Sequence, residues 1–401
     1  MKVRLIVTAL ASSVLILAED GCANANPRVA VARDAGRDPA ASATIDLRAP
    51  RLQVVLAHKG HVYAIEDHFV YASADTGRSY KRLGKLHKSS PRSVSGSVRE
   101  TIARRGITRL LRQYEGPKGM LVLESGTMIV FYDHIYRSDD GGESFHAIDG
   151  TESAMVPRGF PSSVGYATGP ADTVYFGEYT TTKRPHETRI IRGTDDGRRW
   201  EVAFTFPSGE VFHVHSVTYD PYRRGFWVAT GDEDHESRLM FTNDHFQTLQ
   251  TIGCCSQDWR LVDMIATEDA LYWGSDDDRK QPGIFRYDVE SRVLERVANI
   301  DNPSYHAARL SNGMLAISTT YEPRSQFTTK MRPPAATSLW LSTDGRLWSR
   351  ALILRADSVQ AAAGRRAQLQ IPSGDPLPAL FATPWFTSRD AFVTLRLDLE
   401  R

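Results

Sequence analysis

A short turn motif recurs along this chain and constrains its fold more than any other feature of the sequence. SADTGRSY at 73–80, SDDGGESF at 138–145 and GTDDGRRW at 193–200 each align an aspartate, a glycine and an aromatic residue. TNDHFQTL at 242–249 lacks the glycine, and STDGRLW at 342–348 is one residue shorter. A unit that recurs in this way indicates a fold assembled from repeated copies of one small structure.

The residue types in the motif suit a tight turn. An aspartate and a nearby Ser or Thr can hydrogen-bond the backbone of the turn, a glycine can adopt a positive φ, and an aromatic ring can cover the turn. The aligned residues are Asp75, Gly77 and Tyr80, then Asp140, Gly142 and Phe145, then Asp195, Gly197 and Trp200. The motif resembles the Asp-box, or BNR, hairpin of sialidase-like β-propellers. We therefore expect these aspartates to shape turns and to take no part in catalysis.

The segments between the motifs are typical of short strands. QVVLAH, HVYAIE, MIVFYD, TVYFGEY and GFWVAT are rich in β-branched and aromatic residues and are bounded by Gly, Asp or Asn. Successive motifs begin 65, 55, 49 and 100 residues apart, and repeats of about 50 residues with four strands each are typical of propeller blades. The sequence predicts an all-β chain folded as a β-propeller of four-stranded blades, with seven blades favoured over six. Strands near 45–57 should close the ring against the C-terminal AFVTLRLDL.

The N-terminal residues predict export. Two basic residues precede an apolar run at 5–18, and Ala23-Asn24-Ala25 forms an A-x-A cleavage site. The expected organisation is a signal peptide at 1–25, a flexible leader at 26–44 and a single propeller domain at 45–401, with a helical insertion near 97–114. The mature protein should be periplasmic or secreted, and no later segment is apolar enough to predict a membrane span.

The cysteines leave alternatives open. Cys22 would carry a lipid anchor if the leader were a lipoprotein signal, but Glu19 and Asp20 conflict with the small or apolar residues that such a signal needs. Cleavage at the A-x-A site would leave Cys254 and Cys255. An exported chain could join these two in a vicinal disulfide, or they could be two small buried side chains.

The bulk composition excludes one class of partner. The chain has 401 residues, a formal net charge of +1 and 24% charged residues. These values are ordinary for a globular protein with ample core. The sequence has no basic stripe with interleaved aromatic residues, so it gives no reason to expect nucleic-acid binding.

Polar residues occur at corresponding positions of several expected strands. In a propeller the innermost strands line the channel, and ligand sites usually occupy the cup formed by the loops at one end. His213 and His215 lie two apart in VFHVHSVTYD, so a strand would direct both side chains to one face. The candidate catalytic residues are His213, His215, Glu178, Arg260 and His306, and the candidate ligand-contacting residues are Tyr179, Asp232, Trp259, Trp273 and Tyr305.

The region 171–322 carries a wider resemblance. FGEYTTTKRPHETRI, FHVHSVTYDPYRRGFWVATGD, WRLVDMIATEDALYWGSDDD and SYHAARLSNGMLAISTTYEP resemble a family of exported bacterial BNR-repeat propeller proteins. The resemblance implies the propeller fold and a connection to polysaccharides, but no particular reaction. A true sialidase also needs an arginine triad and an Arg-Ile-Pro motif near the mature N-terminus. Neither can be identified in this sequence, so sialidase activity is not expected.

Three functions fit these residues. As a polysaccharide lyase, the protein would use a His or Tyr to remove the proton beside a uronate carboxylate, which Arg260 or a metal would neutralise. As a glycoside hydrolase, it would use Glu178 and Asp232 as paired carboxylates. As a carbohydrate-binding or scaffold propeller without catalysis, it would use its aromatic residues for stacking or for packing between blades. We expect an exported propeller that binds polysaccharide or oligosaccharide, with cleavage as the hypothesis to test.

These hypotheses require no cofactor, although the histidine pair suits a metal. A divalent ion could bind His213 and His215 with a carboxylate from Glu178 or Asp232, because two imidazoles on one strand face can coordinate the same ion. The alternative is a pair of structural histidines hydrogen-bonded across the channel. Convergence of the candidate residues in one pocket would favour an enzyme, and scattering would favour a scaffold. The sequence leaves the polymer, its linkage and the oligomeric state undetermined.

Overall fold

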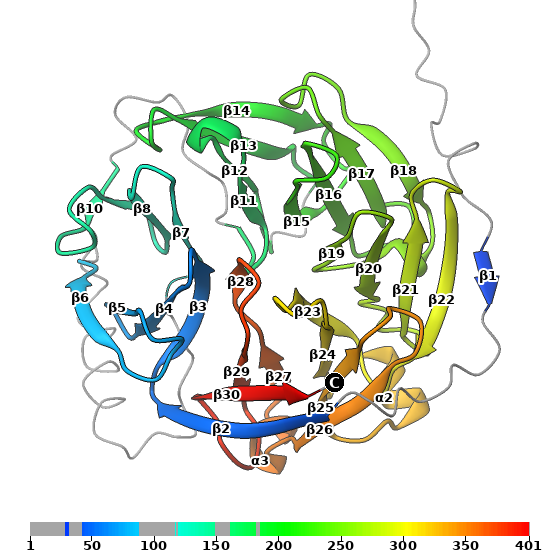
Figure 1. The fold of residues 1–401 in the computed structure, drawn as a ribbon. Helices are drawn as coiled ribbons and strands as arrows, with labels where there is room; N and C mark the ends of the chain where they lie inside the picture. Colours follow the sequence, from blue (N-terminus) through cyan, green and yellow to red (C-terminus); the bar gives the residue numbers. More distant parts are fainter. Residues whose placement is uncertain are drawn as a thin grey trace, which may run out of the picture.

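Antiparallel sheets arranged around a central channel make up most of this protein (Figure 1). The computed structural model describes residues 29–31, 42–87, 117, 119–148, 161–181 and 185–400. The expected signal peptide at 1–25 and the expected helical insertion at 97–114 lie outside these residues. In the three four-stranded sheets the first strand along the chain lies beside the channel, and later strands lie progressively further out. This arrangement confirms the predicted β-propeller fold.

Most sheets contain strands that follow one another in the chain. The first three sheets contain β3 (Gln53–His58), β4 (His61–Glu66), β5 (Phe69–Ser73) and β6 (Lys81–Lys85); β7 (Gly119–Val122), β8 (Met128–Phe131), β9 (Ile135–Ser138) and β10 (His146–Ala147); and β11 (Tyr166–Thr168), β12 (Val174–Gly177), β13 (Thr188–Thr194) and β14 (Arg199–Phe206). The next two contain β15 (His213–Asp220), β16 (Gly225–Gly231), β17 (Arg238–Thr242) and β18 (Gln250–Cys254); and β19 (Ile265–Ala266), β20 (Ala270–Gly274), β21 (Gly283–Asp288) and β22 (Val293–Asn299). Two short strands, β1 (Val29–Val31) and β28 (Ser373–Gly374), pair in parallel with β22 and β3.

The largest sheet has eight strands and closes the ring. Its strands are β23 (Ser304–Arg309), β24 (Leu315–Tyr321), β25 (Ala336–Ser342), β26 (Ser349–Arg355), β27 (Ala367–Gln370), β29 (Leu380–Trp385), β30 (Val393–Glu400) and β2 (Ser42–Pro50). The N-terminal β2 pairs antiparallel with the C-terminal β30, which confirms the expected closure of the ring. Dividing this sheet at the β24–β27 pairing gives the grouping that seven blades require. The number of blades stays a prediction.

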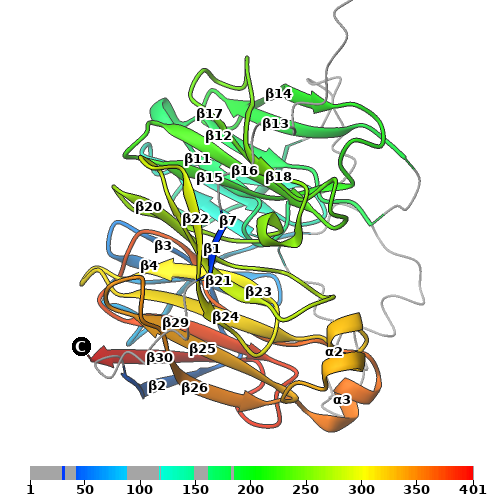
Figure 2. The same cartoon turned by 90° about the vertical axis from the view of Figure 1, so that its right-hand side faces the viewer.

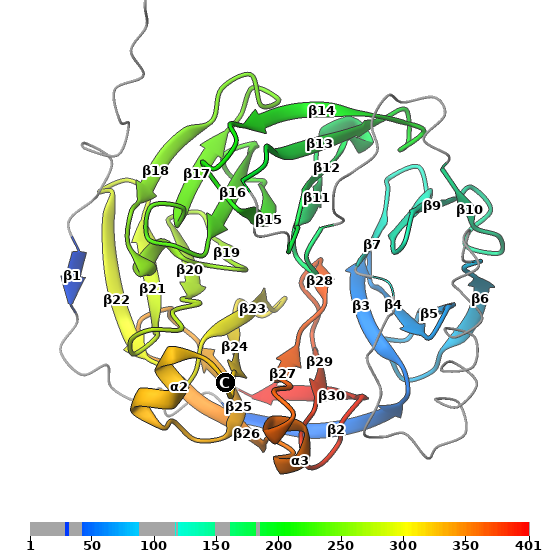
Figure 3. The same ribbon diagram turned by 180° about the vertical axis from the view of Figure 1, so that it is seen from behind.

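Short helices occupy the ends of the strands. Within the described residues they are two 3-10 helices, Pro170–Asp172 and Gln257–Trp259, and two α-helices, α2 (Gln326–Met331) and α3 (Ser358–Ala362). Ser325 caps α2 by accepting a hydrogen bond from the backbone of Thr328, and Asp357 caps α3 in the same way. The two α-helices project together from one end of the ring, as the side view and the view from behind show (Figure 2, Figure 3). Among the described residues, none of the helices has the length and hydropathy that a membrane crossing would require.

The core lies between neighbouring sheets, so a strand can be buried on both faces. Every residue of β16 is buried, which explains the nearly continuous apolar run in GFWVATG. Trp227 of this strand packs against Phe241, with the ring centroids 4.6 Å apart. An apolar cluster continues from Trp227 through Leu239 to Leu271 in the next sheet.

The central channel contains a cavity, and the histidine pair lies outside the residues that line it. A cavity of about 490 Å³ is lined by inner-strand residues such as Val122, Ala167, Val217 and Ala307. His213 and His215 lie at the beginning of β15, before the part of that strand that lines the cavity. We call the end of the channel at which the innermost strands begin the cup.

The repeated turns join the third and fourth strands of their sheets. In the turn between β5 and β6, Asp75 Oδ1 accepts hydrogen bonds from the backbone of Arg78 and Ser79 at 3.0 and 2.9 Å. The backbone of Gly77 donates to Ser73 Oγ at 2.8 Å. Asp140, Asp244 and Asp344 each accept backbone hydrogen bonds within their own turns. The aspartate therefore organises the turn even at 242–249, where the glycine is missing.

The turn at Asp195 is different from the other four. β13 and β14 remain paired up to Thr194 and Arg199, which leaves only a short hairpin between them. Asp195 and Asp196 both have positive φ, 54° and 52°. The side chain of Asp195 forms ion pairs with Arg198 and Arg199. The sequence at 193–200 matches the motif well, yet it forms a tighter turn. The reason is that the pairing of β13 with β14 continues close to the end of the hairpin.

The adjacent cysteines have unlike environments. Cys254 ends β18 and is buried, whereas Cys255 is exposed and has a left-handed backbone, with φ 70°. Of the two alternatives, the one with two buried side chains does not hold for Cys255, because the strand ends before it.

Candidate functional site

Four neighbouring sheets each present an acidic residue just beyond their second strand. These residues are Glu178 after β12, Asp232 after β16, Asp276 after β20 and Glu322 after β24. The second strand of a blade runs antiparallel to the first, so its end lies beside the beginning of the innermost strand. The fold therefore brings Asp232 close to the histidines at the start of β15, and Glu322 close to Tyr305 at the start of β23.

His213 and His215 face each other in the cup. Their Nε2 atoms are 3.0 Å apart, which confirms the expectation that the two rings lie side by side. The pairing of β15 with β16 shifts register between Val214 and Ser216, so a bulge interrupts the strand at this place. Val214 packs directly on Gly177, where an added Cβ atom would lie 2.3 Å from the Val214 Cβ.

Backbone carbonyls determine which nitrogen of each ring carries a proton. His213 Nδ1 lies 3.1 Å from the oxygen of Thr180, and His215 Nδ1 lies 2.9 Å from the oxygen of Leu261. A carbonyl oxygen only accepts, so each Nδ1–H must donate. In the neutral rings both Nε2 atoms then present a lone pair. Burial lowers the pKa of His215, which favours its neutral form.

Asp232 completes this group at the solvent-facing side. Its Oδ1 lies 3.6 Å from His213 Nε2 and 3.4 Å from His215 Nε2. Asp232 is 37% exposed, whereas the histidine side chains are 3% and 2% exposed. Burial opposes ionisation of Asp232, but the pKa of this carboxyl is nevertheless held well below its usual range, with the charge of Arg260 beside it as one cause. Among the described residues, these three side chains place candidate metal-ligand atoms within 4.8 Å of one another.

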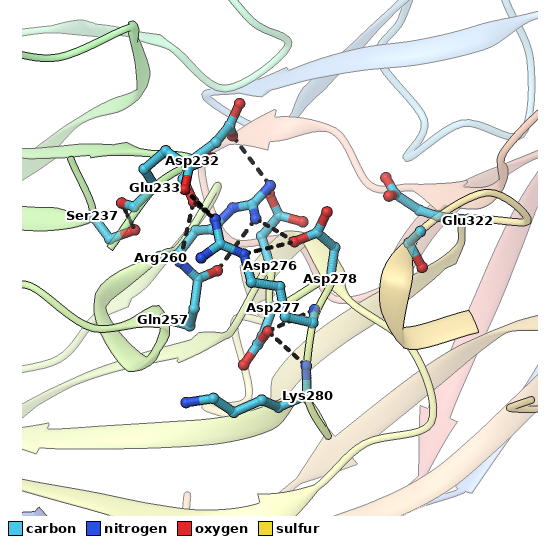
Figure 4. A network of polar contacts seen from close by, with 12 residues as sticks. Asp232, Glu233, Ser237, Gln257, Arg260, Asp276, Asp277, Asp278, Lys280 and Glu322 are labelled. Carbon is cyan, nitrogen blue, oxygen red and sulfur yellow. Dashed lines mark hydrogen bonds and ion pairs between the residues drawn. The ribbon is translucent and has the colours of Figure 1, made fainter. Parts of the chain in front are cut away.

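Arg260 lies among three carboxylates (Figure 4). Its Nη2 is 3.1 Å from both Asp232 Oδ1 and Asp276 Oδ2, and its Nη1 is 2.7 Å from Asp278 Oδ1. Burial raises the pKa of Asp276 well above its usual value, against the attraction of Arg260. Because its guanidinium is already matched by protein carboxylates, Arg260 holds the acidic side of the cup together.

Tyr179 covers the histidine pair. Its ring stacks on His213, with the centroids 4.0 Å apart and the planes 23° from parallel. Burial, together with the charges of Asp232 and Asp276, raises the pKa of Tyr179 to about 12. The phenol therefore stays protonated at neutral pH.

Tyr305, Glu322 and Arg366 form a second group in the cup. The Tyr305 hydroxyl donates a short hydrogen bond to Glu322 Oε1. Arg366 Nε lies 2.9 Å from the same oxygen, and its guanidinium carbon lies 5.8 Å from the centre of the Tyr305 ring. The Arg366 side chain is 57% exposed, so this cation faces solvent. Burial raises the pKa of Tyr305.

The sequence analysis missed Glu322 and Arg366 as site residues. Glu322 had a usable signal, because it follows its second strand just as Asp232 and Asp276 follow theirs. Arg366 had none, because it lies in the connection between α3 and β27, outside the repeated pattern.

The side chains of two predicted catalytic residues do not join the cup groups. The buried carboxylate of Glu178 forms paired hydrogen bonds with the side chain of Arg189 on the neighbouring strand of its own sheet, at 2.9 and 2.5 Å. Both carboxylate oxygens of Glu178 therefore accept hydrogen bonds from Arg189. His306 is buried, its Nδ1 has no hydrogen-bond partner, and burial lowers its pKa to about 4.

The predicted ligand-stacking tryptophans are core residues. Trp259 and Trp273 are 2% and 0% exposed and lie in the apolar cluster between two sheets. Their ring centroids are 5.5 Å apart. The prediction that they contact ligand is wrong, because packing between blades covers both faces of each ring. Tyr179 and Tyr305 are the predicted aromatic residues that do lie in the cup.

Comparison with known proteins identifies the fold. No protein-family model matches the sequence, and no curated protein matches it. A structure described as YCF48 bound to D1 peptide superposes with a TM-score of 0.55 at 10% identity, covering 91% of this chain and 98% of that one. A streptogramin B lyase gives 0.52 at 10% identity, covering 90% and 98%. An oligogalacturonate lyase in complex with manganese gives 0.51 at 10% identity, covering 90% and 91%. These likenesses show that the chain is a β-propeller.

Proposed function

We propose that this protein is an exported β-propeller that binds a uronate-containing polysaccharide in the cup and cleaves it by β-elimination. The observation that carries the proposal is the hydrogen bond between Tyr305 and Glu322, with the solvent-exposed guanidinium of Arg366 beside both. Removal of a proton next to a carboxylate needs a proton-transfer group and a nearby cation, and this group supplies both.

The proton transfers can be written with side chains of this protein. Tyr305 passes its phenolic proton to Glu322 while its oxygen takes the proton from the carbon beside the uronate carboxylate. The bond from the next carbon to the glycosidic oxygen breaks, and a carbon–carbon double bond forms. The leaving oxygen takes a proton from Tyr305, and Glu322 then returns its proton to the phenolate. Arg366 stabilises the negative charge that develops on the phenol and the substrate.

The arginines have different roles in this proposal. Arg260 was expected to neutralise the substrate carboxylate, but three protein carboxylates surround it. In the described part of the chain, Arg366 pairs with one carboxylate, that of Glu322, and it faces solvent. We therefore assign substrate carboxylate binding to Arg366 and the positioning of Asp232 to Arg260.

A divalent cation is part of the proposal. Two imidazole nitrogens and one carboxylate oxygen are donors that such an ion accepts, and His213, His215 and Asp232 would hold it. When bound, the ion would supply positive charge for the uronate carboxylate. Two of the structural neighbours are described as lyases, and one of them as a manganese complex. At 10% identity they support only the compatibility of this fold with such chemistry.

The test is an activity screen with two readouts. The purified mature protein is incubated with polyuronates and with neutral glucans, and unsaturated products are followed by ultraviolet absorbance alongside new reducing ends. We expect both signals from a polyuronate and neither from a glucan. Tyr305→Phe and Glu322→Gln should each lower kcat by about 100-fold or more, since general acid–base groups contribute at least that much. Tyr222→Phe is the matched control, because Tyr222 is an exposed tyrosine beside the channel cavity.

Each other outcome identifies a different function. New reducing ends without ultraviolet absorbance would mean hydrolysis. Binding of a polysaccharide without either signal would mean a carbohydrate-binding scaffold. Export is tested separately by expressing the full chain and sequencing the protein recovered from the periplasm or the medium, which should begin near Asn26. A lipid-modified Cys22 would contradict this expectation.

A further inference from the structure

We propose that His213, His215 and Asp232 bind one divalent transition-metal ion of the Mn²⁺ or Zn²⁺ type. The proposal specifies the cation of the proposed function and rests on that function only for the role of the ion. Binding itself follows from the arrangement of the three side chains, and it can be measured without any substrate.

The first argument is that the lone pairs of the two imidazoles face each other with no proton between them. Thr180 and Leu261 fix both Nδ1–H groups as donors through their carbonyl oxygens. The two Nε2 lone pairs then meet at 3.0 Å, and neither neutral ring has a hydrogen to place between them. A metal ion or an added proton would turn this repulsion into attraction. A backbone carbonyl on the second nitrogen is also the usual support of a metal-binding histidine.

The second argument is the spacing of the donors. Donors about 2.1 Å from a tetrahedrally coordinated ion lie roughly 3.4 Å from one another. The separations between His213 Nε2, His215 Nε2 and Asp232 Oδ1 are 3.0, 3.4 and 3.6 Å. The three atoms could therefore coordinate a single ion with only small movements.

The third argument is charge. Asp232, Asp276 and Asp278 surround the guanidinium of Arg260, and Arg279 Nε also lies 3.9 Å from Asp278 Oδ1. Of these carboxylates, Asp232 is the one that also faces His213 and His215. A divalent ion bound there would place its positive charge directly beside the Asp232 carboxylate.

The donor types indicate which ion is bound. Two imidazoles and one carboxylate suit Zn²⁺, Mn²⁺ and related ions, whereas Ca²⁺ and Mg²⁺ prefer oxygen ligands throughout. The histidines are buried and Asp232 is partly exposed, so the ion would have protein on one side and open coordination positions toward the cup. Open positions are typical of catalytic rather than structural metal sites.

The test measures binding and ligand geometry separately from activity. The purified mature protein is treated with a chelator and titrated by calorimetry with Mn²⁺, Zn²⁺ and Ca²⁺. We expect one equivalent of Mn²⁺ or Zn²⁺ per chain and much weaker Ca²⁺ binding. His213→Ala, His215→Ala and Asp232→Asn should each weaken binding by more than roughly 100-fold, because loss of an outer partner alone typically costs 10–100-fold.

A control and a spectrum make the result independent of folding. His58→Ala should keep full affinity, because His58 pairs with a carboxylate, Asp375 at 3.8 Å, outside this cluster. Co²⁺ in the wild-type protein should give visible absorption bands that are absent from His215→Ala, while the melting temperatures without metal remain similar. Failure of the wild-type protein to bind any of these ions at one per chain would overturn the proposal. Retention of binding in all three variants would also overturn it. We would then conclude that the two histidines share a proton.

The metal site and the elimination reaction can fail independently. Stoichiometric binding without polyuronate cleavage would refute the reaction and leave the site. Absence of binding together with cleavage that survives both the chelator and His215→Ala would refute the metal site and leave the reaction.

Discussion

Three histidines lie near the beginnings of inner strands, and they differ in whether Nδ1 donates a hydrogen bond to a backbone carbonyl. His213 and His215 each donate to a carbonyl 33 and 46 residues away in the sequence. His306 also lies near the start of an inner strand, but its Nδ1 is unpartnered and its pKa is lowered to about 4 by burial. At the scale of one residue, the nearest carbonyl decides whether an imidazole can act as a ligand.

Asp263 is a second residue whose behaviour depends on its surroundings. Its carboxylate lines the channel cavity and accepts hydrogen bonds from the backbone of Met264 and Ala307 at 2.8 and 2.9 Å. Burial nevertheless raises the pKa of Asp263 to about 7. The folded protein therefore holds this proton in a pH range in which the unfolded chain has lost it.

The raised pKa predicts a pH-dependent stability. Below about pH 4 the carboxyl is protonated in both states. As pH rises from about 4 to about 7, the unfolded chain releases the proton first, so the free energy of unfolding falls, by at most about 1.4 kcal/mol per pH unit. Asp263→Asn should remove this slope. Urea unfolding of the wild-type and variant proteins at several pH values measures the difference, and identical slopes would contradict the assignment.

At the scale of elements, the strand that carries the histidine pair depends on a close approach between two sheets. Val214 lies between His213 and His215 and contacts Gly177 at the end of β12. A side chain at residue 177 would overlap the β-branched Val214, which has few alternative rotamers.

Gly177→Ala should therefore disturb the site without touching a ligand. The variant is expected to lose about 1 to 3 kcal/mol of stability through overpacking and to bind the cation more weakly. Gly126→Ala is the control, because no atom lies within 4 Å of its added Cβ, although its φ of 87° makes any side chain strained. Calorimetric titration and urea unfolding of both variants give the two quantities. Unchanged cation affinity in Gly177→Ala would show that the histidines are positioned by other contacts.

At the scale of the whole molecule, the ring is closed by strands from opposite ends of the chain. Leu397 of β30 pairs with Ile45 of β2 and with Leu380 of β29, and it is fully buried. The stability of the ring therefore depends on contacts between residues that are far apart in the sequence.

Leu397→Ala should destabilise the entire protein. Removing a buried leucine side chain typically costs about 2 to 5 kcal/mol, and here the loss falls on the closure of the ring. Ile353→Ala, at a position that is 48% exposed, should cost less than about 1 kcal/mol. Urea unfolding monitored by tryptophan fluorescence compares them. A local effect of Leu397→Ala, with cooperative unfolding of the remaining sheets unchanged, would mean that closure does not couple the blades.

The sequence alone determined the repeated architecture and part of the site. Turn chemistry and strand composition are local, so the repeats predicted a propeller, its closing strands and the side-by-side placement of His213 and His215. Local patterns also marked Asp232, Tyr179 and Tyr305. The tertiary structure decided which side chains meet. It paired Glu178 with Arg189, buried Trp259 and Trp273 between sheets, and brought Arg366 to Tyr305 from a connection that carries no repeat signal. Hydrogen bonds and ion pairs act over a few ångströms in space, whatever the separation along the chain, and a single sequence does not specify those distances.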